Sequence, residues 1–320
     1  MRSSHSLKHS FERQRRAFGK NLQQTRAGEL EPLHQCRVAT RRLRELLRLC
    51  ASDLPRGTVS RARRRVRRFG RALGDVRELD VSICLIGELV DADRLQPAAA
   101  VRLRQYLDDE RNRRRRRMAG RVSPKNARKV ERDLAEVAKA LGMKQQGDRW
   151  SQALALRITR RAQHVRDAVV EAASFYVAER VHTVRITTKK LRYVLEFARE
   201  TGDGQTKTAT NQLKSIQDML GRLHDLEVLQ KLIQSLLIPA DQQHNWALQL
   251  EVLRLDLAGE CRRLHGDFVA TQPALLEICQ GVFELASKIW SESGCEGPTG
   301  RVLKRTLRAT ASSLRVVNSA

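Results

Sequence analysis

A pattern that occurs twice constrains the fold of this chain more than any other feature. Residues 34–49 read H-Q-C-R-V-A-T-R-R-L-R-E-L-L-R-L, and residues 182–197 read H-T-V-R-I-T-T-K-K-L-R-Y-V-L-E-F, at an offset of 148 positions. A second pair of segments, L-G-D-V-R-E-L-D-V at 73–81 and L-G-R-L-H-D-L-E-V at 220–228, matches at an offset of 147. Because two separate motifs keep nearly the same spacing, the sequence indicates an internal duplication with two half-units.

The first copy of the pattern, taken as an α-helix, separates cationic from apolar side chains. At about 100° per residue, one face collects Leu43, Leu46, Leu47 and other apolar side chains, and the opposite stripe collects His34, Arg37, Arg41, Arg44 and Arg48. Side chains three or four positions apart lie ~5–6 Å from one another, and like charges at that spacing destabilise a helix by a few tenths of a kcal/mol per pair. The row is therefore expected to bind an anionic ligand along its length.

These segments resemble the CHAD domain, the conserved-histidine α-helical domain. The H-x-x-R-[VI]-x-x-[RK]-[RK]-L-R segment and the L-G-x-x-[RH]-[DE]-L-[DE]-V segment each occur twice in the family's order, and the resemblance covers roughly residues 5–290. It implies an all-α fold of two four-helix bundles related by pseudo-two-fold symmetry, with a basic central cavity that binds inorganic polyphosphate. Two positions depart from the pattern: Glu78 stands where aspartate is usual, and His224 stands where the first copy has Arg77.

The expected polyphosphate site combines cations from both copies of the pattern and from segments beside them. Polyphosphate repeats one anionic unit, so its site needs closely spaced cations on a rigid support. Arginine suits this role because it offers several donors and stays charged when partly desolvated. The candidate residues are His34, Arg37, Arg41, Arg42, Arg44, Arg48, Arg64, Arg68, Arg71, Arg77, His182, Arg185, Lys189, Lys190, Arg192, Tyr193, Lys214 and His224.

The histidines and the tyrosine of this set each have a second interpretation. His34 and His182 could be ordinary, partly buried residues, although their equal position in both copies favours contact with a ligand, whose phosphate would raise the pKa of each imidazole. Tyr193 could donate its hydroxyl to a phosphate oxygen or could cap the bundle.

A metal site built from these histidines and nearby carboxylates, such as Asp80 and Glu227, is the next alternative. The sequence contains no H-x-x-x-H or H-E-x-x-H spacing, and so positive a site would repel free metal ions. No metal ligands and no cofactor are expected, and divalent cations are expected at most as counterions of the polyphosphate.

Apolar periodicity of the helical type extends along most of the chain. The half-units are expected at residues 1–145 and 146–290, with the linker between them at 142–147 and a flexible basic tail at 291–320. A helix over 97–121, followed by a break, is expected in the first half.

Further local expectations concern the L-G segment at residues 73–81 and the stretch from residue 241 to residue 290. One helix is expected to end near Leu73 and the next to open after Gly74, with Asp80 orienting Arg77. Residues 241–264 and 273–290 are expected to form two separate scaffold helices.

The charge of the chain selects polyanions as partners. The sequence has 61 lysines and arginines against 36 aspartates and glutamates, a net charge of +25, and such a field attracts polyanions over neutral ligands. Residues 1–150 hold 38 of these cations and 18 of the acids, whereas residues 151–320 hold 23 and 18. The two halves are therefore expected to contribute unequally to binding.

Nonspecific binding of RNA or DNA is the alternative function. It would use the arginine-rich stretches 61–71 and 111–117, although the second stretch could equally be a solvated helix face. Aromatic residues make up 4% of the chain, which argues against the base stacking used by most readers of single strands. Weak nucleic-acid binding is therefore a secondary expectation.

Catalysis has little support in the sequence. There is no G-x-x-x-x-G-K-[ST], G-x-G-x-x-G or G-x-S-x-G motif, and phosphoryl transfer normally uses carboxylates that hold Mg²⁺. The cationic rows are almost free of acids. The chain is expected to bind its ligand without transforming it.

Location is predicted from the absence of targeting features. Residues 1–16 are rich in arginine and serine but contain no apolar core of a secretory signal, and Glu12 and the helical pattern favour a first helix. No run approaches the ~18 apolar residues that cross a bilayer. The six cysteines include no C-x-x-C pair and are expected to be reduced. The protein is expected in the cytoplasm, at polyphosphate granules, and its oligomeric state stays open.

Overall fold

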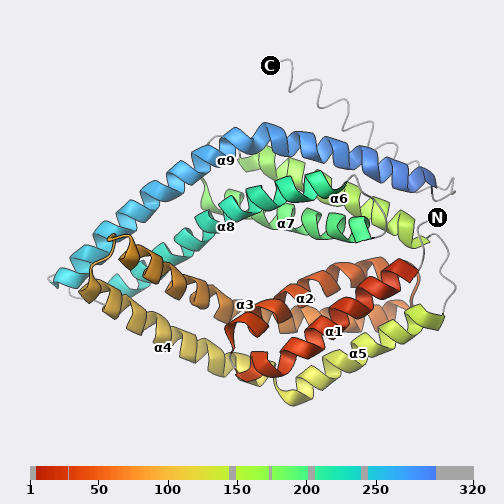
Figure 1. The fold of residues 1–320 in the computed structure, drawn as a ribbon, viewed down its shortest axis with the longest axis horizontal. Helices are drawn as coiled ribbons and strands as arrows, with labels where there is room; N and C mark the ends of the chain where they lie inside the picture. Colours follow the sequence, from red (N-terminus) through yellow and green to blue (C-terminus); the bar gives the residue numbers. More distant parts are fainter. Residues whose placement is uncertain are drawn as a thin grey trace.

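The computed structural model describes residues 5–27, 29–143, 149–172, 175–200, 206–238 and 244–292. These residues form α-helices and one short 3₁₀ helix without any strand, so the all-α prediction is confirmed. The elements, drawn in Figure 1, are α1 (His5–Ala27), α2 (Leu30–Leu49), η1 (Cys50–Ser52), α3 (Arg56–Asp91), α4 (Pro97–Arg121), α5 (Pro124–Met143), α6 (Arg149–Ala172), α7 (Ala178–Glu200), α8 (Thr206–Leu237) and α9 (Asn245–Glu292).

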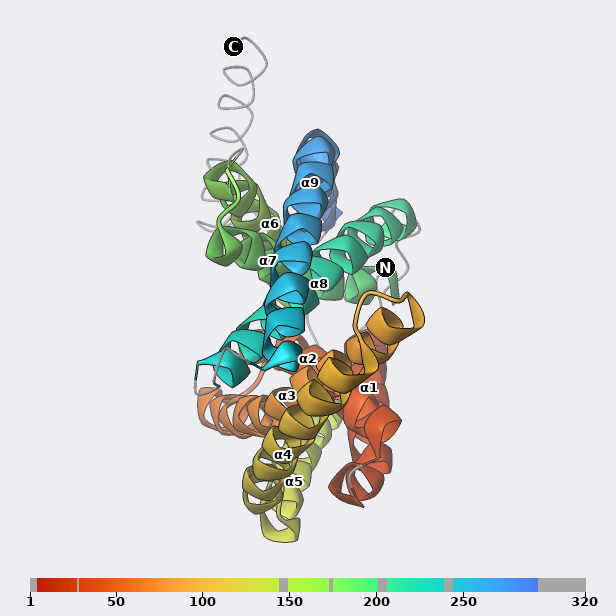
Figure 2. The ribbon, with the colours of Figure 1, turned by 90° about the vertical axis from the view of Figure 1, so that its left-hand side faces the viewer.

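The helices follow the same order in the two halves of the chain. α2 and α7 carry the histidine-led motif, and α3 and α8 carry the L-G motif. In the second half α9 packs along both α6 and α8, whereas in the first half α4 packs on α3, and α5 packs on α1 and α3. Figure 2 shows the helices of the first half, red to yellow, below those of the second half, green to blue.

The predicted limits of the half-units stay predictions. Their boundary at residue 145 and most of the linker 142–147 lie outside the described residues, as does the tail after Glu292. The predicted break after residue 121 is confirmed, since α4 ends at Arg121 and α5 begins at Pro124.

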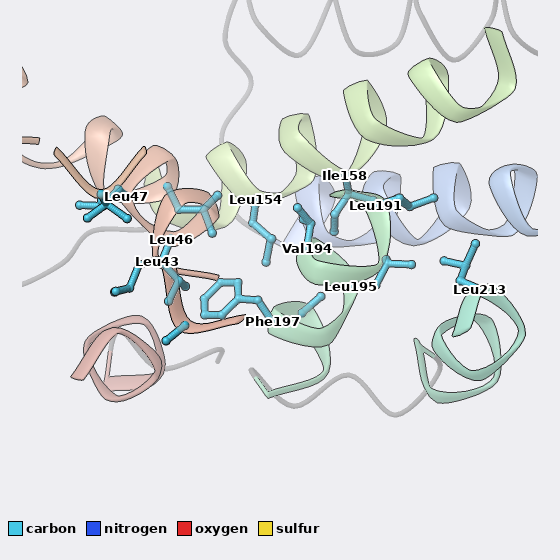
Figure 3. Packing of buried hydrophobic residues seen from close by; sticks show 14 of the residues in the cluster. Leu43, Leu46, Leu47, Leu154, Ile158, Leu191, Val194, Leu195, Phe197 and Leu213 are labelled. Atoms are coloured by element: carbon cyan, nitrogen blue, oxygen red, sulfur yellow. The ribbon is translucent and has the colours of Figure 1, made fainter. Parts of the chain in front are cut away.

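The larger hydrophobic core joins the two halves. Leu43, Leu46 and Leu47 of α2 lie beside Leu154 of α6 and Phe197 of α7 (Figure 3), and all five side chains are at most 5% exposed. Burying an aliphatic or aromatic side chain of this size stabilises the fold by roughly 1.5–3 kcal/mol. Apolar packing therefore fixes the position of one motif helix relative to the other.

A second core forms where the long helices extend away from the first. It joins the C-terminal part of α3 to α4, and the C-terminal part of α8 to the N-terminal part of α9, through buried residues such as Leu79, Ile86, Leu103, Leu226 and Leu257. α3 and α8 thus contribute to both cores. Each of these helices is anchored on both sides of its L-G motif.

Two predicted helix ends are wrong. α3 runs without a break through Gly74, and α9 runs through Pro273. A helical glycine costs only about 1 kcal/mol and a proline about 3 kcal/mol, and both positions lie between buried side chains that hold the helix on either side, such as Val76 and Leu275. α9 changes direction along its length (Figure 1), as helices do around an internal proline.

Among the described helices, none has the length and apolar character needed to cross a membrane. The described cysteines are free thiols, of which Cys36, Cys50, Cys261 and Cys279 are buried and Cys84 is exposed.

Candidate polyanion-binding site

The two motif helices bring their cations together. Arg37 and Arg41 of α2 lie within electrostatic range of Arg185 and Lys189 of α7, and Arg192 adds a further charge beside Lys189. We call these five residues the central cluster. Residues 148 positions apart in the sequence thus meet at one place.

The central cluster is crowded with positive charge. Burial, followed by repulsion from Arg41 and Arg185, lowers the pKa of Arg37 to about 10. Burial, followed by repulsion from Arg41, Arg185 and Arg37, lowers the pKa of Lys189 to about 7. Each shift means that the protein disfavours the charged form of that side chain. An anion placed here would reverse this penalty.

Two acids lie beside the central cluster, one from each L-G motif. Glu78 of α3 and Asp225 of α8 occupy equivalent motif positions and partly offset the charge of Arg185. Burial raises the pKa of Asp225, and Glu78 Oε2 lies 3.3 Å from Arg114 Nη1 of α4. Glu227 also offsets the charge of Arg185, and Glu196 pairs with Arg192. The five cations of the cluster therefore still outnumber these four carboxylates.

Arg37 packs against α3 at Gly74 of the L-G motif. A Cβ atom at Gly74 would lie 3.7 Å from Arg37 Nη2 and 3.8 Å from Arg37 Cζ, so the guanidinium lies directly against the backbone of α3. The matching Gly221 of α8 has nothing within 4 Å of its Cβ position. The first copy of the motif therefore supports an arginine of the central cluster, whereas the second copy leaves open space.

The motif histidines lie beside the neighbouring L-G helices. Burial and then the charge of Arg77 lower the pKa of His34. Burial and then His224 lower the pKa of His182, and the Nδ1 atoms of these two histidines are 3.2 Å apart. Since His224 matches Arg77 in the duplication, each half pairs its motif histidine with the same position of its L-G segment.

A further acid, Glu227, lies beside the second histidine pair, which consists of His182 and His224. His224 Nδ1 lies 3.7 Å from Glu227 Oε2, and the hydroxyl of Tyr176 donates to Glu227 Oε1 at 2.7 Å. Glu227 therefore contacts both His224, on the same helix, and Tyr176. The described residues contain no group of three or more His, Cys, Asp or Glu side chains arranged to hold a metal ion.

Comparison with known proteins gives the family. The model of the CHAD domain matches residues 9–234, which is most of the chain. The chain belongs to the CHAD domain family. No curated protein matches it.

Solved structures share the fold of this CHAD domain. The crystal structure of the CHAD domain from the plant Ricinus communis aligns with a TM-score of 0.62 and 24% identity, covering 85% of this chain and 91% of the other. PptA from Streptomyces chartreusis aligns with a TM-score of 0.56 and 18% identity, covering 87% of this chain and 98% of the other. At these identities the likeness concerns the fold alone.

Other predicted site residues of the CHAD domain are held by acids. Arg42 Nη2 and Arg192 Nη1 each lie 3.0 Å from the carboxylate of Glu196. Arg48 Nη1 lies 2.5 Å from Glu45 Oε1. The pair of Arg42 with Glu196 ties α2 to α7, whereas the other two pairs lie within one helix. Each pair occupies part of its cation's donor capacity.

Arg157 and Arg161 of α6 were missed by the sequence prediction. Arg157 Nη2 lies 2.6 Å from Glu45 Oε2, and Arg161 Nη2 lies 3.2 Å from Glu45 Oε1. Lys190 is close enough for Arg161 and Glu45 to affect its pKa, which burial lowers. The spacing of four residues in R-I-T-R-R was the available signal, but α6 carries no duplicated motif that would have drawn attention to it.

Tyr193 is a buried residue of α7. It is 9% exposed, and the guanidinium carbon of Arg192 lies 5.4 Å from the centre of its ring. Its aromatic ring therefore lies against the guanidinium of Arg192. A contact of its hydroxyl with phosphate stays a prediction.

The arginine-rich start of α3 divides into two faces. Arg61 and Arg65 bind Asp133 of α5, at 3.5 and 2.6 Å. The other face holds exposed arginines without an ion pair to any described acid, and Arg67 on this face lies near Arg44 of α2. This exposed face, which we call the outer strip, consists of Arg63, Arg64, Arg67, Arg68 and Arg71.

The arginine run of α4 is largely occupied by acids of the same domain. Arg113 Nε and Arg114 Nε lie 2.8 and 2.9 Å from Glu110, and Arg111 Nε lies 2.6 Å from Asp80 Oδ1. The prediction that Asp80 orients Arg77 is therefore wrong. Asp80 is 2% exposed, and its carboxylate binds Arg111 of α4 instead.

Proposed function

We propose that this CHAD domain binds inorganic polyphosphate along the central cluster and does not transform it. The observation that carries the proposal is the convergence of α2 and α7, which places Lys189 among arginines of both halves and lowers its pKa to about 7. Such a site is unfavourable when empty and gains most from a ligand with repeated, closely spaced negative charges. Inorganic polyphosphate is a ligand of that kind, and the family resemblance points to it.

The geometry also favours binding over catalysis. Hydrolysis or transfer of a phosphoryl group normally needs carboxylates that hold Mg²⁺ and a positioned nucleophile. Two acids beside the central cluster, Glu78 and Asp225, come from different helices and lie among arginines. Their chemistry suits positioning the cations rather than holding a metal ion.

Nucleic-acid binding is the second candidate, and the outer strip favours it. These exposed arginines could follow a phosphate backbone without reading bases. The arginine run of α4 was also predicted as a possible nucleic-acid contact, but Glu110 and Asp80 partly neutralise it. The remaining exposed surface suits weak, salt-sensitive contact with a nucleic acid.

A competition titration separates the two candidates. Labelled long-chain polyphosphate bound to the protein would be challenged with duplex DNA and with RNA at equal phosphate concentration in ~0.15 M salt, where counterion-driven binding is weakened. Polyphosphate is expected to bind at least tenfold more tightly, because arginines fixed on two facing helices match a flexible, dense line of charge. Equal competition by either nucleic acid would favour the second candidate.

The proposed cellular role is attachment to polyphosphate granules, where the ligand is most concentrated. A fluorescent fusion of the full chain is expected to gather on granules, and the same fusion with Arg37, Arg41 and Arg44 changed to alanine is expected to spread through the cell. An unchanged pattern in the variant would contradict this role.

A further inference from the structure

A basic hollow lies at one end of the central cluster, between α2, α7 and α8. It has a volume of about 170 Å³ and is lined by four cations, Arg42, Arg192, Arg199 and Lys214, together with Glu196 and Asn211 among others. Arg192 belongs to the central cluster as well, since it lies beside Lys189. The hollow is therefore continuous with the proposed polyphosphate site.

The cations of the hollow exceed its available acids. Glu196 is shared by Arg42 and Arg192 at 3.0 Å each, whereas Arg199 and Lys214 form no ion pair with a described acid. The other lining acid, Glu200, accepts a hydrogen bond from Ser10 at 2.6 Å and pairs with Arg13, both on α1. Its carboxylate is therefore committed to α1, and the hollow keeps a positive excess.

Two buried donors in the hollow also lack acceptors. The Nε atoms of Arg42 and Arg192 are shielded from solvent and have no hydrogen-bond partner among the described residues. Leaving a buried donor unsatisfied is unfavourable, and more so for charged groups. An anion in the hollow would instead favour the charge of the two guanidinium groups, whose Nη atoms already bind the carboxylate of Glu196.

We propose that this hollow binds the terminal phosphate of a polyphosphate chain whose internal phosphates lie along the central cluster. The inference rests on the proposed function and adds which part of the ligand the protein recognises there.

The chemistry of a chain end matches the hollow better than an internal phosphate does. Like a phosphate monoester, a terminal phosphate has three free oxygens and a charge of about −1.5 to −2 at pH 7, whereas an internal phosphate has two free oxygens and one charge. The hollow also has room for a phosphate group, since its volume of about 170 Å³ is well above the ~10–15 Å³ that a single water needs.

The walls of the hollow favour an end over a passing chain. On one side the contacts of Glu200 with Ser10 and Arg13 tie the end of α7 to α1. On another side Arg42 and Glu196 bridge α2 and α7. A chain that follows the central cluster past Arg192 therefore meets two cross-links between helices at this point.

The test uses the full chain and linear tripolyphosphate, either with free ends or with both ends capped as methyl esters. The wild-type protein is expected to bind the capped form at least tenfold more weakly, because each cap removes a charge and a free oxygen. The variant Arg199→Ala/Lys214→Ala is expected to bind the free-ended form at least tenfold more weakly than wild type and to distinguish the two forms by less than twofold. Its affinity for chains of about 100 phosphates should fall by less than about threefold.

The matched control is Arg180→Ala/Lys207→Ala, which removes the same charge from exposed positions on the same two helices. It should keep the full penalty for capping. An equal capping penalty in the wild type and in Arg199→Ala/Lys214→Ala would overturn the inference, as would a loss of that penalty in the control. If the wild type binds long polyphosphate but ignores capping, this inference alone fails. If it binds no polyphosphate of any length, the proposed function itself fails.

Discussion

At the scale of single residues, Lys189 shows most clearly that the free site would gain from an anionic ligand. Its ammonium group is buried beside Arg41, Arg185 and Arg37, and its pKa is lowered to about 7, so the charged form is disfavoured in the free protein. A bound phosphate would favour that charged form again. The protonation of Lys189 therefore depends on whether an anion is bound.

Polyphosphate binding is therefore expected to take up protons above pH 7. At pH 8 Lys189 is mostly neutral, and the ligand would raise its pKa, so affinity should fall as the pH rises from 7 to 9. Calorimetry in buffers of different ionisation enthalpy measures this uptake, which Lys189→Met should reduce by most of one proton. Equal uptake in this variant and the wild type would show that another group carries the effect.

The same shift has a consequence for stability without ligand. The unfolded chain has the ordinary lysine pKa near 10.5, so between pH 7 and pH 10.5 it binds more protons at this position than the folded chain. Stability should therefore increase with pH across that window. Lys189→Met should flatten this increase and raise the melting temperature at pH 6, where the folded protein must hold the charge.

At the scale of helices, α3 supports the site through its close approach to α2. A Cβ atom at Gly70 would lie 2.9 Å from Oγ1 of Thr40, whose hydroxyl donates to the carbonyl of Arg37 at 2.8 Å. Thr40 is 1% exposed and cannot move aside into solvent. Gly70 therefore sets the distance between the helix that carries Arg37 and the helix that supports it.

Two glycine substitutions in α3 test this close approach. Gly70→Ala should destabilise the fold despite the better helix propensity of alanine, because the new methyl group collides with Thr40. Gly87→Ala, in the same helix with nothing within 4 Å of its Cβ position, should stabilise it by about 0.5–1 kcal/mol. Urea denaturation measures both. A stabilising Gly70→Ala would mean that the helices can separate without cost.

The helices also show what the sequence could and could not predict. The spacing of the two motifs predicted two equivalent half-units, and the resemblance to the CHAD domain implied that they share a basic central cavity. The breaks near Gly74 and Pro273 were wrong because local propensity of a few kcal/mol is outweighed by tertiary packing on both sides. Asp80 could not be assigned because its partner, Arg111, lies in another helix. Arg157 and Arg161 were missed because α6 carries no copy of the motifs and their acid, Glu45, lies in another helix.

At the scale of the whole molecule, one core fixes the site. Leu43 and Leu47 of the first half and Leu154 and Phe197 of the second belong to the same buried cluster, so the motif helices are held against each other despite the repulsion of their charges. The second core anchors the far ends of α3 and α8. Neither half alone assembles the central cluster, because its cations come from α2 and α7.

The most direct test measures polyphosphate affinity after neutralising either half of the site. Arg37→Ala/Arg41→Ala/Arg44→Ala and Arg185→Ala/Lys189→Ala/Arg192→Ala should both keep the helical circular dichroism, because the apolar faces are untouched. Each should lose at least a hundredfold in affinity, since well-placed charge-assisted hydrogen bonds contribute about 1.5–3 kcal/mol apiece. The first variant should lose more, because its half carries most of the net charge. Arg113→Ala/Arg116→Ala/Arg117→Ala, on α4, should bind within threefold of wild type. Wild-type affinity in either motif variant, with binding lost in the α4 variant, would contradict a site shared by the two halves.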